Sequence, residues 1–187
     1  MTTEKNIRAL DLGCGKSKHP GAIGLDMNRG VNPDIIHEMR FKENLPFADN
    51  SFDRVYMIDF MEHVDNIEWM LSEVHRICSP SAQVEVQYPH YSSPDFHNDV
   101  THKHGLGIHA LDHFDPDYGF GKLHSSYTLF DRCFPFKIKK IDINFQEGLM
   151  GRISRFLFAK KGGDFYESHL SAFLPIKNVH IDLEVIK

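Results

Sequence analysis

Short blocks of hydrophobic residues, separated by polar and turn-forming residues, recur through the first half of the chain. Each block is apolar along most of its length, which is typical of strands that are covered on both faces of a parallel sheet. The blocks predict five early strands, over residues 7–11, 22–26, 34–37, 52–58 and 83–88.

One amphipathic helix is predicted between the last two of these strands. Apolar residues follow one another there at steps of three and four, which places them on one face of a helix. The Ser-Pro pair at residues 79–80 ends the helix. Strand, helix and strand in this order form a βαβ unit, so the pattern predicts an α/β fold with a largely parallel sheet. The apolar residues of the helix are Ile67, Met70, Leu71, Val74 and Ile77.

The connections between the first strands are unusually short. Ten residues separate Asp11 from Ala22, and they include Pro20 and Gly21. A crossover between parallel strands usually takes a dozen residues or more. The next connection, MNRGVNP, is shorter still and rich in turn formers. We therefore expect shortened or missing early helices, and thin coverage of one side of the sheet.

The second half of the chain has a different pattern. Residues 136–145 and 179–185 alternate as strands do, and residues 149–160 fit an amphipathic helix between them. These elements predict a mostly parallel sheet that is closed by a late antiparallel strand. Residues 89–130 hold seven of the thirteen histidines with little periodicity, so we expect an irregular excursion over the sheet edge. Long segments of this kind tend to be functional.

Composition narrows the class of protein. With 187 residues, 41% of them hydrophobic, the chain suits one α/β core, so we expect a single domain over 1–187. The net charge of -5 does not supply the basic surface that a phosphate backbone requires, so no nucleic-acid partner is expected. Cys14, Cys78 and Cys133 are too dispersed for a disulfide framework, and we see neither an apolar signal core nor a transmembrane segment. These features predict a cytoplasmic protein.

The sequence LDLGCGK places a glycine turn at the end of the first predicted strand. Gly13 and Gly15, on either side of Cys14, let the backbone approach a ligand at the carboxyl edge of the sheet. The third glycine of the dinucleotide-binding fingerprint is absent, since Lys18 stands in its place. Asp11 would also repel a pyrophosphate. The turn therefore favours a cationic or zwitterionic ligand.

A second acidic residue, Asp26, lies at the tip of the next predicted strand. A carboxylate at this position can accept hydrogen bonds from two ribose hydroxyls, because both of its oxygens are acceptors. Aspartate also often ends a strand before a turn, which explains the residue without a ligand. The glycine turn one strand earlier favours the ribose role.

Three blocks of sequence carry a family resemblance, and they occur in order across residues 7–89. The blocks are LDLGCGKSKHPGAIGLDMN, LPFADNSFDRVYMIDFMEHV and LSEVHRICSPSAQVEVQYP. Together they resemble the small, type-11-like group of class I S-adenosylmethionine-dependent methyltransferases. The resemblance implies a Rossmann-like sheet, S-adenosylmethionine as cofactor and a methyl-transfer reaction.

Carried over residue by residue, the resemblance implies a set of cofactor contacts. The glycine loop lies beneath the methionine part of the cofactor, and the acidic residue at the second strand tip binds the ribose. The residues after the second and third strands border the adenine, and those after the fourth strand border the methionine part. The implied set is Asp11, Gly13, Cys14, Gly15, Asp26, Met27, Glu38, Met39, Asp59, Phe60 and His63. Glu62 and His63 are expected at the start of the following helix.

Catalytic candidates come from the segment after the fifth strand, because the carboxyl ends of the fourth and fifth strands adjoin the reactive methyl group. We select His90 and Tyr91 as acceptor contacts. His102 is the third candidate, since DVTHKH resembles a D-P-T-H-K-R stretch of related bacterial proteins. A histidine with a near-neutral pKa can act as a base where the acceptor carries a proton.

The same segment also offers metal-ligand types. Their spacing matches no established metal motif, so no metal site is predicted. A metal-assisted methyltransferase stays as an alternative. The residues in question are His97, His102, His104 and His109, with Asp95 and Asp99 nearby.

The interpretation that results is a methyltransferase acting on oxygen or nitrogen of a small-molecule or saccharide-type acceptor. Residues 89–130 and 146–178 are expected to build the acceptor pocket. The basic and aromatic residues of 149–175 also fit a membrane-surface face, although packing on the sheet explains them more simply. A different class stays open, a regulatory or partner subunit that binds S-adenosylmethionine or S-adenosylhomocysteine without catalysis.

Overall fold

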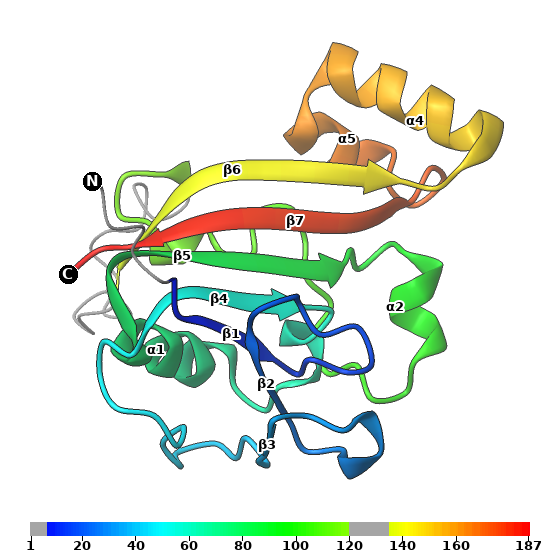
Figure 1. Ribbon diagram of the computed structural model, residues 1–187. Coiled ribbons are helices and arrows are strands. Elements are labelled where there is room, and N and C mark those ends of the chain that lie inside the picture. Colours follow the sequence, from blue (N-terminus) through cyan, green and yellow to red (C-terminus); the bar gives the residue numbers. More distant parts are fainter. Residues whose placement is uncertain (1–6, 120–134) are drawn as a thin grey trace, which may run out of the picture.

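The computed structural model describes residues 7–119 and 135–187 (Figure 1). Their strands form one seven-stranded sheet in the order β3-β2-β1-β4-β5-β7-β6. The pairs β1–β2, β1–β4, β2–β3 and β4–β5 are parallel, and β7 is antiparallel to both β5 and β6. The predicted mostly parallel sheet with a late antiparallel strand is confirmed. Cys133 and residues 120–130 of the histidine-rich excursion lie outside the described residues.

The strands agree with the hydrophobic blocks, and two of them extend further than predicted. Their bounds are β1 Ala9–Leu12, β2 Ile23–Asp26, β3 Ile35–Ile36, β4 Phe52–Ile58, β5 Cys78–Pro89, β6 Phe136–Phe145 and β7 Ile176–Val185. Strand β5 begins directly after the preceding helix, because Cys78 already pairs with Phe52 of β4. A shift in register follows before Gln83, near Ser81 with its positive φ of 61°.

The predicted amphipathic helix is α1, Ile67–Ile77. Its amino end is capped by the Asn66 side chain, which accepts a hydrogen bond from the backbone N–H of Trp69 at 2.7 Å. The apolar residues Met70, Leu71, Val74 and Ile77 have no exposed surface. Burial of side chains of this size stabilises the fold by about 1.5–3 kcal/mol each. The α1 face therefore anchors the β4–β5 part of the sheet.

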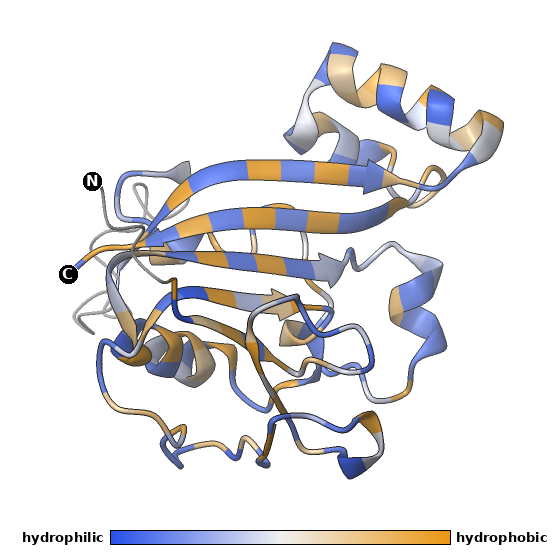
Figure 2. Ribbon diagram, in the orientation of Figure 1, coloured by the Kyte–Doolittle hydropathy of each residue, from blue (hydrophilic) through white to orange (hydrophobic). Residues whose placement is uncertain are grey.

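Coverage is thin over the first strands, as the short connections predicted. Strands β2 and β3 are joined through a single 3₁₀ turn, η1 (Arg29–Val31), and no helix of the described residues joins β1 to β2. Ile23 on β2 and Ile36 on β3 are 41% and 53% exposed. Figure 2 shows hydrophobic residues along these strands with little ribbon in front of them.

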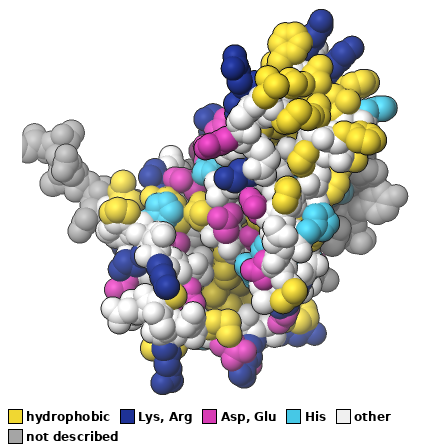
Figure 3. Space-filling model, turned by 90° about the vertical axis from the view of Figure 1, so that its right-hand side faces the viewer, with side chains coloured by type: hydrophobic (Ala, Val, Ile, Leu, Met, Phe, Trp, Pro, Cys, Tyr) yellow, Lys and Arg dark blue, Asp and Glu magenta, His cyan; other side chains and the backbone are white. Residues whose placement is uncertain are grey.

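The remaining helices of the described residues are the 3₁₀ turns η2 (Met61–His63) and η3 (Asp112–Phe114) and the helices α2 (Pro94–Asn98), α4 (Gly148–Lys161) and α5 (Gly163–His169). Figure 1 shows α4 and α5 together near the end of β6. Helix α4 buries Gly151 and Ser154, while Leu149 and Phe156 are 71% and 63% exposed. Figure 3 shows hydrophobic side chains gathered in this part of the molecule, with Lys and Arg around them. Packing on the sheet therefore explains only part of the α4 pattern. No described helix has both the length and the apolar content that a bilayer crossing requires.

Candidate functional site

The carboxyl ends of β1, β2 and β4 meet at one edge of the sheet, and the glycine turn lies there (Figure 1). The backbone N–H groups of Gly13 and Cys14 donate to the carbonyl oxygen of Leu25 at 2.8 and 3.3 Å. Gly13 and Gly15 have φ values of +66° and +52°, which glycine adopts without the steric cost of a side chain. The predicted glycine turn is therefore present after β1, and its backbone is bent back against β2.

Asp26 is fixed at the tip of β2. Its Oδ2 accepts a hydrogen bond from the backbone N–H of Gly15 at 2.9 Å, and its Oδ1 accepts one from Asn28 at 2.8 Å. A carboxylate oxygen can accept more than one hydrogen bond, so both oxygens keep acceptor capacity for a ligand. Met27 beside it is 62% exposed, and a Cβ on Gly15 would meet nothing closer than 4.0 Å. An open backbone bend thus adjoins an oriented carboxylate and an exposed apolar side chain, which fits a ribonucleoside.

Asp11 holds the other end of the glycine loop. The side chain is 3% exposed, and its Oδ2 accepts a hydrogen bond from the backbone N–H of His19 at 2.8 Å. The Nδ1 atom of His19 lies 3.2 Å from the same oxygen, and its ring stacks on Tyr56 with centroids 3.8 Å apart. A buried carboxylate beneath the loop opposes a pyrophosphate and suits a ligand with a positive charge.

Asp59 and Phe60 follow β4 and adjoin the glycine turn. Asp59 has a φ of +49°, a left-handed conformation that is uncommon outside glycine and that clusters at functional sites. The backbone N–H of Asp59 donates to the carbonyl oxygen of Gln87 at 2.9 Å. The Phe60 ring fills the space beside Gly13, where an added Cβ would lie 2.4 Å from Cδ2 of the ring. The structure therefore brings the predicted loop and the predicted β4 residues together.

Glu38 and Met39 lie beyond β3, the outermost strand. Arg40 Nη2 donates to Glu38 Oε2 at 2.6 Å, and this hydrogen bond holds the pKa of the Glu38 carboxyl below its usual value. Met39 packs against the core. Glu38 is half-exposed, so it can still meet a ligand on its open side.

His63 and His102 lie together with Glu62, beside Asp59. Glu62 and His63 belong to a separate 3₁₀ turn, η2 (Met61–His63), rather than to the start of α1 as predicted. The rings of His63 and His102 have centroids 4.6 Å apart, and His102 Nε2 lies 3.9 Å from Glu62 Oε1. Glu62 is 1% exposed, and burial raises the pKa of its carboxyl to about 8, with a further rise from the charges of Asp59 and Asp99.

His90 and Tyr91 are bonded within the protein. His90 has no exposed surface, its Nε2 lies 2.8 Å from Glu167 Oε1, and its Nδ1 lies 2.8 Å from Ser92 Oγ. The Tyr91 hydroxyl lies 3.2 Å from Ser171 Oγ. These contacts give His90 a structural role, since it joins the end of β5 to α5.

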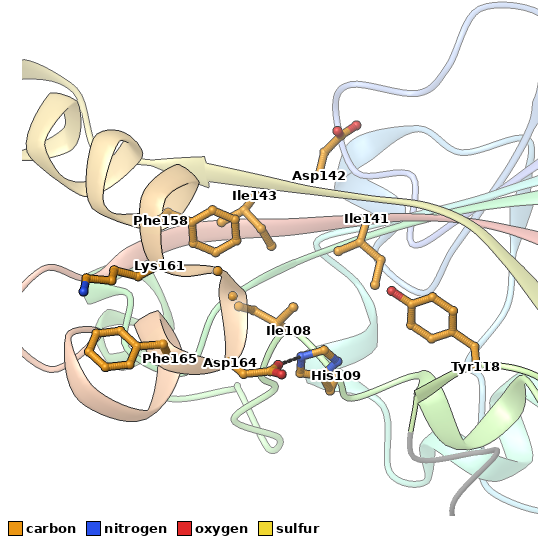
Figure 4. A pocket seen from close by; sticks show the side chains of 12 residues that line it. Ile108, His109, Tyr118, Ile141, Asp142, Ile143, Phe158, Lys161, Asp164 and Phe165 are labelled. Carbon is orange, nitrogen blue, oxygen red and sulfur yellow. Dashed lines mark hydrogen bonds and ion pairs between the residues drawn. The ribbon is translucent and has the colours of Figure 1, made fainter.

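A cavity of about 510 Å³ lies between the excursion, strand β6 and the α4–α5 pair (Figure 4). Ile141 and Ile143 of β6 point toward Ile108 and His109, whereas Asp142 points to the opposite side of the strand. No residue of the implied cofactor set lines this cavity.

His109 is charged at the floor of this cavity. Its Nδ1 lies 2.9 Å from Asp112 Oδ2, and its Nε2 lies 2.7 Å from Asp164 Oδ1. The hydrogen bond with Asp112 raises the pKa of His109 to about 9, with a smaller contribution from Asp164. Both ring nitrogens therefore donate at neutral pH. The sequence offered His109 only as a metal ligand, and it gave no signal for Asp112 or Asp164.

Comparison with known proteins agrees with this geometry. Residues 10–85 match a family model described as a methyltransferase domain. Over 96 residues the chain is 30% identical to sterol 24-C-methyltransferase ERG6B of Gibberella zeae. This match covers 40% of this chain and 25% of that protein. The matches thus span a quarter or less of the length of the curated relatives.

Solved structures share the fold over nearly the whole chain. A SAM dependent methyltransferase from Archaeoglobus fulgidus superposes with a TM-score of 0.60 at 17% identity, over 95% of this chain and 86% of that one. A chain from a complex that contains the Haloferax volcanii Trm112 methyltransferase activator has a TM-score of 0.56 at 14% identity, over 100% and 85% of the two chains. Residues 10–85 thus match the model of the methyltransferase-domain family, and the chain has the fold of solved S-adenosylmethionine-dependent methyltransferases.

Proposed function

We propose that the chain binds S-adenosylmethionine at the carboxyl edge of β1, β2 and β4 and transfers its methyl group to oxygen or nitrogen of a small-molecule or saccharide-type acceptor. The observation that carries this proposal is the Asp26 carboxylate, oriented by the backbone N–H groups of Gly15 and Asn28 beside an open glycine bend. This arrangement lies within the residues that match the methyltransferase domain.

Each part of the edge suits a part of the cofactor. Asp26 accepts hydrogen bonds from the ribose hydroxyls, and the exposed Met27 lies against the adenine. The buried charge of Asp11 lies beneath the loop that faces the ammonium and sulfonium end. Phe60, packed on Gly13, borders the methionine part. When bound, S-adenosylmethionine supplies an electrophilic methyl group, so the protein needs to orient the nucleophile and exclude water.

The cavity between β6 and the α4–α5 pair supports the proposed acceptor-pocket elements. Its lining comes from residues 108–118 of the excursion and residues 158–165 of the helical pair. A volume of about 510 Å³ lies within the range of small-molecule pockets. The apolar side chains of Ile108, Ile141 and Phe158 in its lining suit an acceptor that has an apolar body.

His102 is the catalytic candidate that we retain. It lies beside His63 and Glu62, next to the β4 residues that border the methionine part. Its Nδ1 lies 2.8 Å from the carbonyl oxygen of Phe96, which accepts a hydrogen bond, so the basic nitrogen is Nε2. The single lone pair of the neutral ring is then on Nε2, where it can contact the acceptor or an ion that binds it.

The test is cofactor binding followed by transfer. Calorimetry with S-adenosylhomocysteine measures binding, and incubation of the protein with methyl-labelled S-adenosylmethionine and host metabolite fractions measures transfer. Label in a low-molecular-weight product, lost with the Asp26→Ala variant, supports the proposal. Binding with no transfer to any fraction supports the regulatory-subunit alternative, and absence of binding refutes both.

The proposed compartment is the cytoplasm, or another reducing environment. Cys14 and Cys78 are buried free thiols, and burial raises the pKa of Cys78 to about 12. Buried thiols of high pKa serve packing rather than redox chemistry. The net charge of -5 continues to oppose a nucleic-acid partner.

A further inference from the structure

Three metal-ligating side chains converge at the carboxyl end of β4, in the cluster of Glu62, His63 and His102. One ligand atom from each of the three side chains lies within 4.8 Å of the other two. Glu62 comes from the η2 turn together with His63, whereas His102 comes from the excursion after β5. The backbone joins the two segments, because the N–H of Lys103 donates to the carbonyl oxygen of Glu62 at 2.7 Å.

The Glu62 carboxylate points into this cluster without a hydrogen-bond donor. The residue is 1% exposed, and neither of its oxygens has a hydrogen-bond partner among the residues that the structure describes. A buried carboxylate without a donor is costly, and buried charges are normally paired or bound to a metal. The nearest ring nitrogen, His102 Nε2 at 3.9 Å, is too distant for a hydrogen bond.

In both histidines of the cluster, Nδ1 is the nitrogen that donates a hydrogen bond within the protein. His102 Nδ1 lies 2.8 Å from the carbonyl oxygen of Phe96, which can only accept, so this nitrogen carries the proton. The Thr101 hydroxyl donates to Asp99 at 2.6 Å and therefore accepts from His63 Nδ1 at 3.0 Å. In the neutral form of each ring, Nε2 is then the unprotonated nitrogen. Metal-binding histidines typically have this arrangement, with the other nitrogen donating to a carbonyl or hydroxyl oxygen.

The charge around the cluster also favours a cation. Asp59 and Asp99 act electrostatically on Glu62, which brings three carboxylates together. The nearby cation, Lys103, forms an ion pair with Asp65 at 2.6 Å. Two imidazoles and one carboxylate form a ligand set that suits first-row transition metals better than Mg²⁺ or Ca²⁺. Three protein ligands leave at least one coordination position open for another molecule.

We propose that Glu62, His63 and His102 bind one divalent transition-metal ion, whose open position takes an oxygen atom of the methyl acceptor. This inference rests on the proposed function for the identity of the fourth ligand. A metal ion lowers the pKa of a bound hydroxyl, so the hydroxyl proton leaves to solvent. The oxygen lone pair then forms the bond to the methyl carbon. The carbon–sulfur bond breaks with its electron pair on sulfur, which leaves S-adenosylhomocysteine. The acceptor is thus a hydroxyl compound.

The test is a titration of the metal-free full-length protein with Co²⁺, followed by visible absorption and by the NMR signals of the histidine rings. We expect one ion per chain and paramagnetic shifts of two histidine rings in the unmodified protein. Glu62→Gln keeps the shape of the side chain but removes its charge. Glu62→Gln and His102→Ala, as two single variants, should each weaken Co²⁺ binding by more than ~100-fold. Thr101→Val removes the hydroxyl that joins His63 Nδ1 to Asp99, without removing a proposed ligand, and should weaken binding by ~10–100-fold. Mg²⁺ should not displace Co²⁺.

Two histidines serve as matched controls. His97 is an exposed histidine of the same segment, and His180 belongs to a second acidic and histidine group with Glu85 and Asp182. His97→Ala and His180→Ala should each bind Co²⁺ as the unmodified protein does. The inference is overturned if the unmodified protein binds no Co²⁺, if its histidine signals do not shift, if Glu62→Gln binds equally well, or if His180→Ala abolishes binding. Calorimetry with S-adenosylhomocysteine separates the two proposals. If the protein binds the nucleoside but not Co²⁺, the metal site is refuted and the proposed cofactor site stands.

Discussion

Asp26→Asn separates the ribose role of Asp26 from its role in the loop. In the structure each carboxylate oxygen accepts one backbone hydrogen bond, from Gly15 at 2.9 Å and from Asn28 at 2.8 Å. An asparagine has one acceptor oxygen, so one of these N–H groups faces an amide NH₂ instead. Hydrogen bonds to charged groups contribute about 1.5–3 kcal/mol, and we expect a loss of stability at the lower end of this range. Urea denaturation measures that loss.

Loss of the loop hydrogen bond affects the free and the bound protein alike, so it largely cancels in the binding free energy. The loss that remains is the charged acceptor of the ribose hydroxyls, again about 1.5–3 kcal/mol. The dissociation constant of S-adenosylhomocysteine, measured by calorimetry, should therefore rise by ~10–150-fold, since 1.4 kcal/mol corresponds to tenfold.

Asp34→Asn is the matched control. Asp34 Oδ2 also accepts a backbone hydrogen bond, from Gly24 at 2.7 Å, and it pairs with Lys18 at 2.6 Å. It lies one strand further out and has no expected cofactor contact. The variant should lose stability and keep its affinity for S-adenosylhomocysteine. If Asp26→Asn binds within about threefold of the unmodified protein, or if Asp34→Asn weakens binding as much, the ribose role is refuted.

Three further predictions concern stability. Asp112 raises the pKa of His109 to about 9, so His109 should contribute on the order of 3 kcal/mol to the free energy of unfolding. This contribution should be complete below pH ~6.5 and lost as pH rises through 9. Thermal melts of His109→Gln should lack this pH dependence. Gly13→Ala should lower the free energy of unfolding by about 2 kcal/mol or more, because the φ of Gly13 is +66° and a Cβ would lie 2.4 Å from Phe60. An unchanged midpoint in urea denaturation would contradict this packing. Asp59→Val should cost ~1–2 kcal/mol and Asp59→Gly less, since the backbone there has a φ of +49°; equal losses in chemical denaturation would show that the conformation is not the cause.

Local periodicity accounts for the parts of the fold that could be predicted. The apolar spacing from Ile67 to Ile77 matches the bounds of α1, and the alternation of Phe136–Phe145 matches β6. The short connections predicted the missing early helices, because ten residues with Pro20 and Gly21 cannot form a crossover helix. Helix α5 was not predicted, since its seven residues GDFYESH carry too few turns for an apolar stripe to show.

The arrangement of the candidate site depends on contacts that are distant in sequence. His90 follows the fifth strand, where sequence reasoning places acceptor contacts, and its Nε2 lies 2.8 Å from Glu167 of α5, a partner 77 residues further along the chain. A glutamate such as Glu62, in a polar stretch after a strand, is usually exposed. Only the structure, with His102 close by, shows that the Glu62 carboxylate faces inward. The sequence drew attention to His63 and His102 separately, but it gave no signal that Glu62 joins them.

Strand β7 follows β6 in the chain but lies between β5 and β6 in the sheet. Among the described residues, strand β6 pairs with β7 alone, so it stays unpaired until residues 176–185 arrive. Pairs such as Gln83 with Glu184 join positions about 100 residues apart. During synthesis on the ribosome, the open edge of β5 and the whole of β6 wait for this final insertion. A truncated product that ends before residue 176 keeps both strand edges unsatisfied, so it should aggregate and be cleared by proteases rather than accumulate as a smaller stable protein.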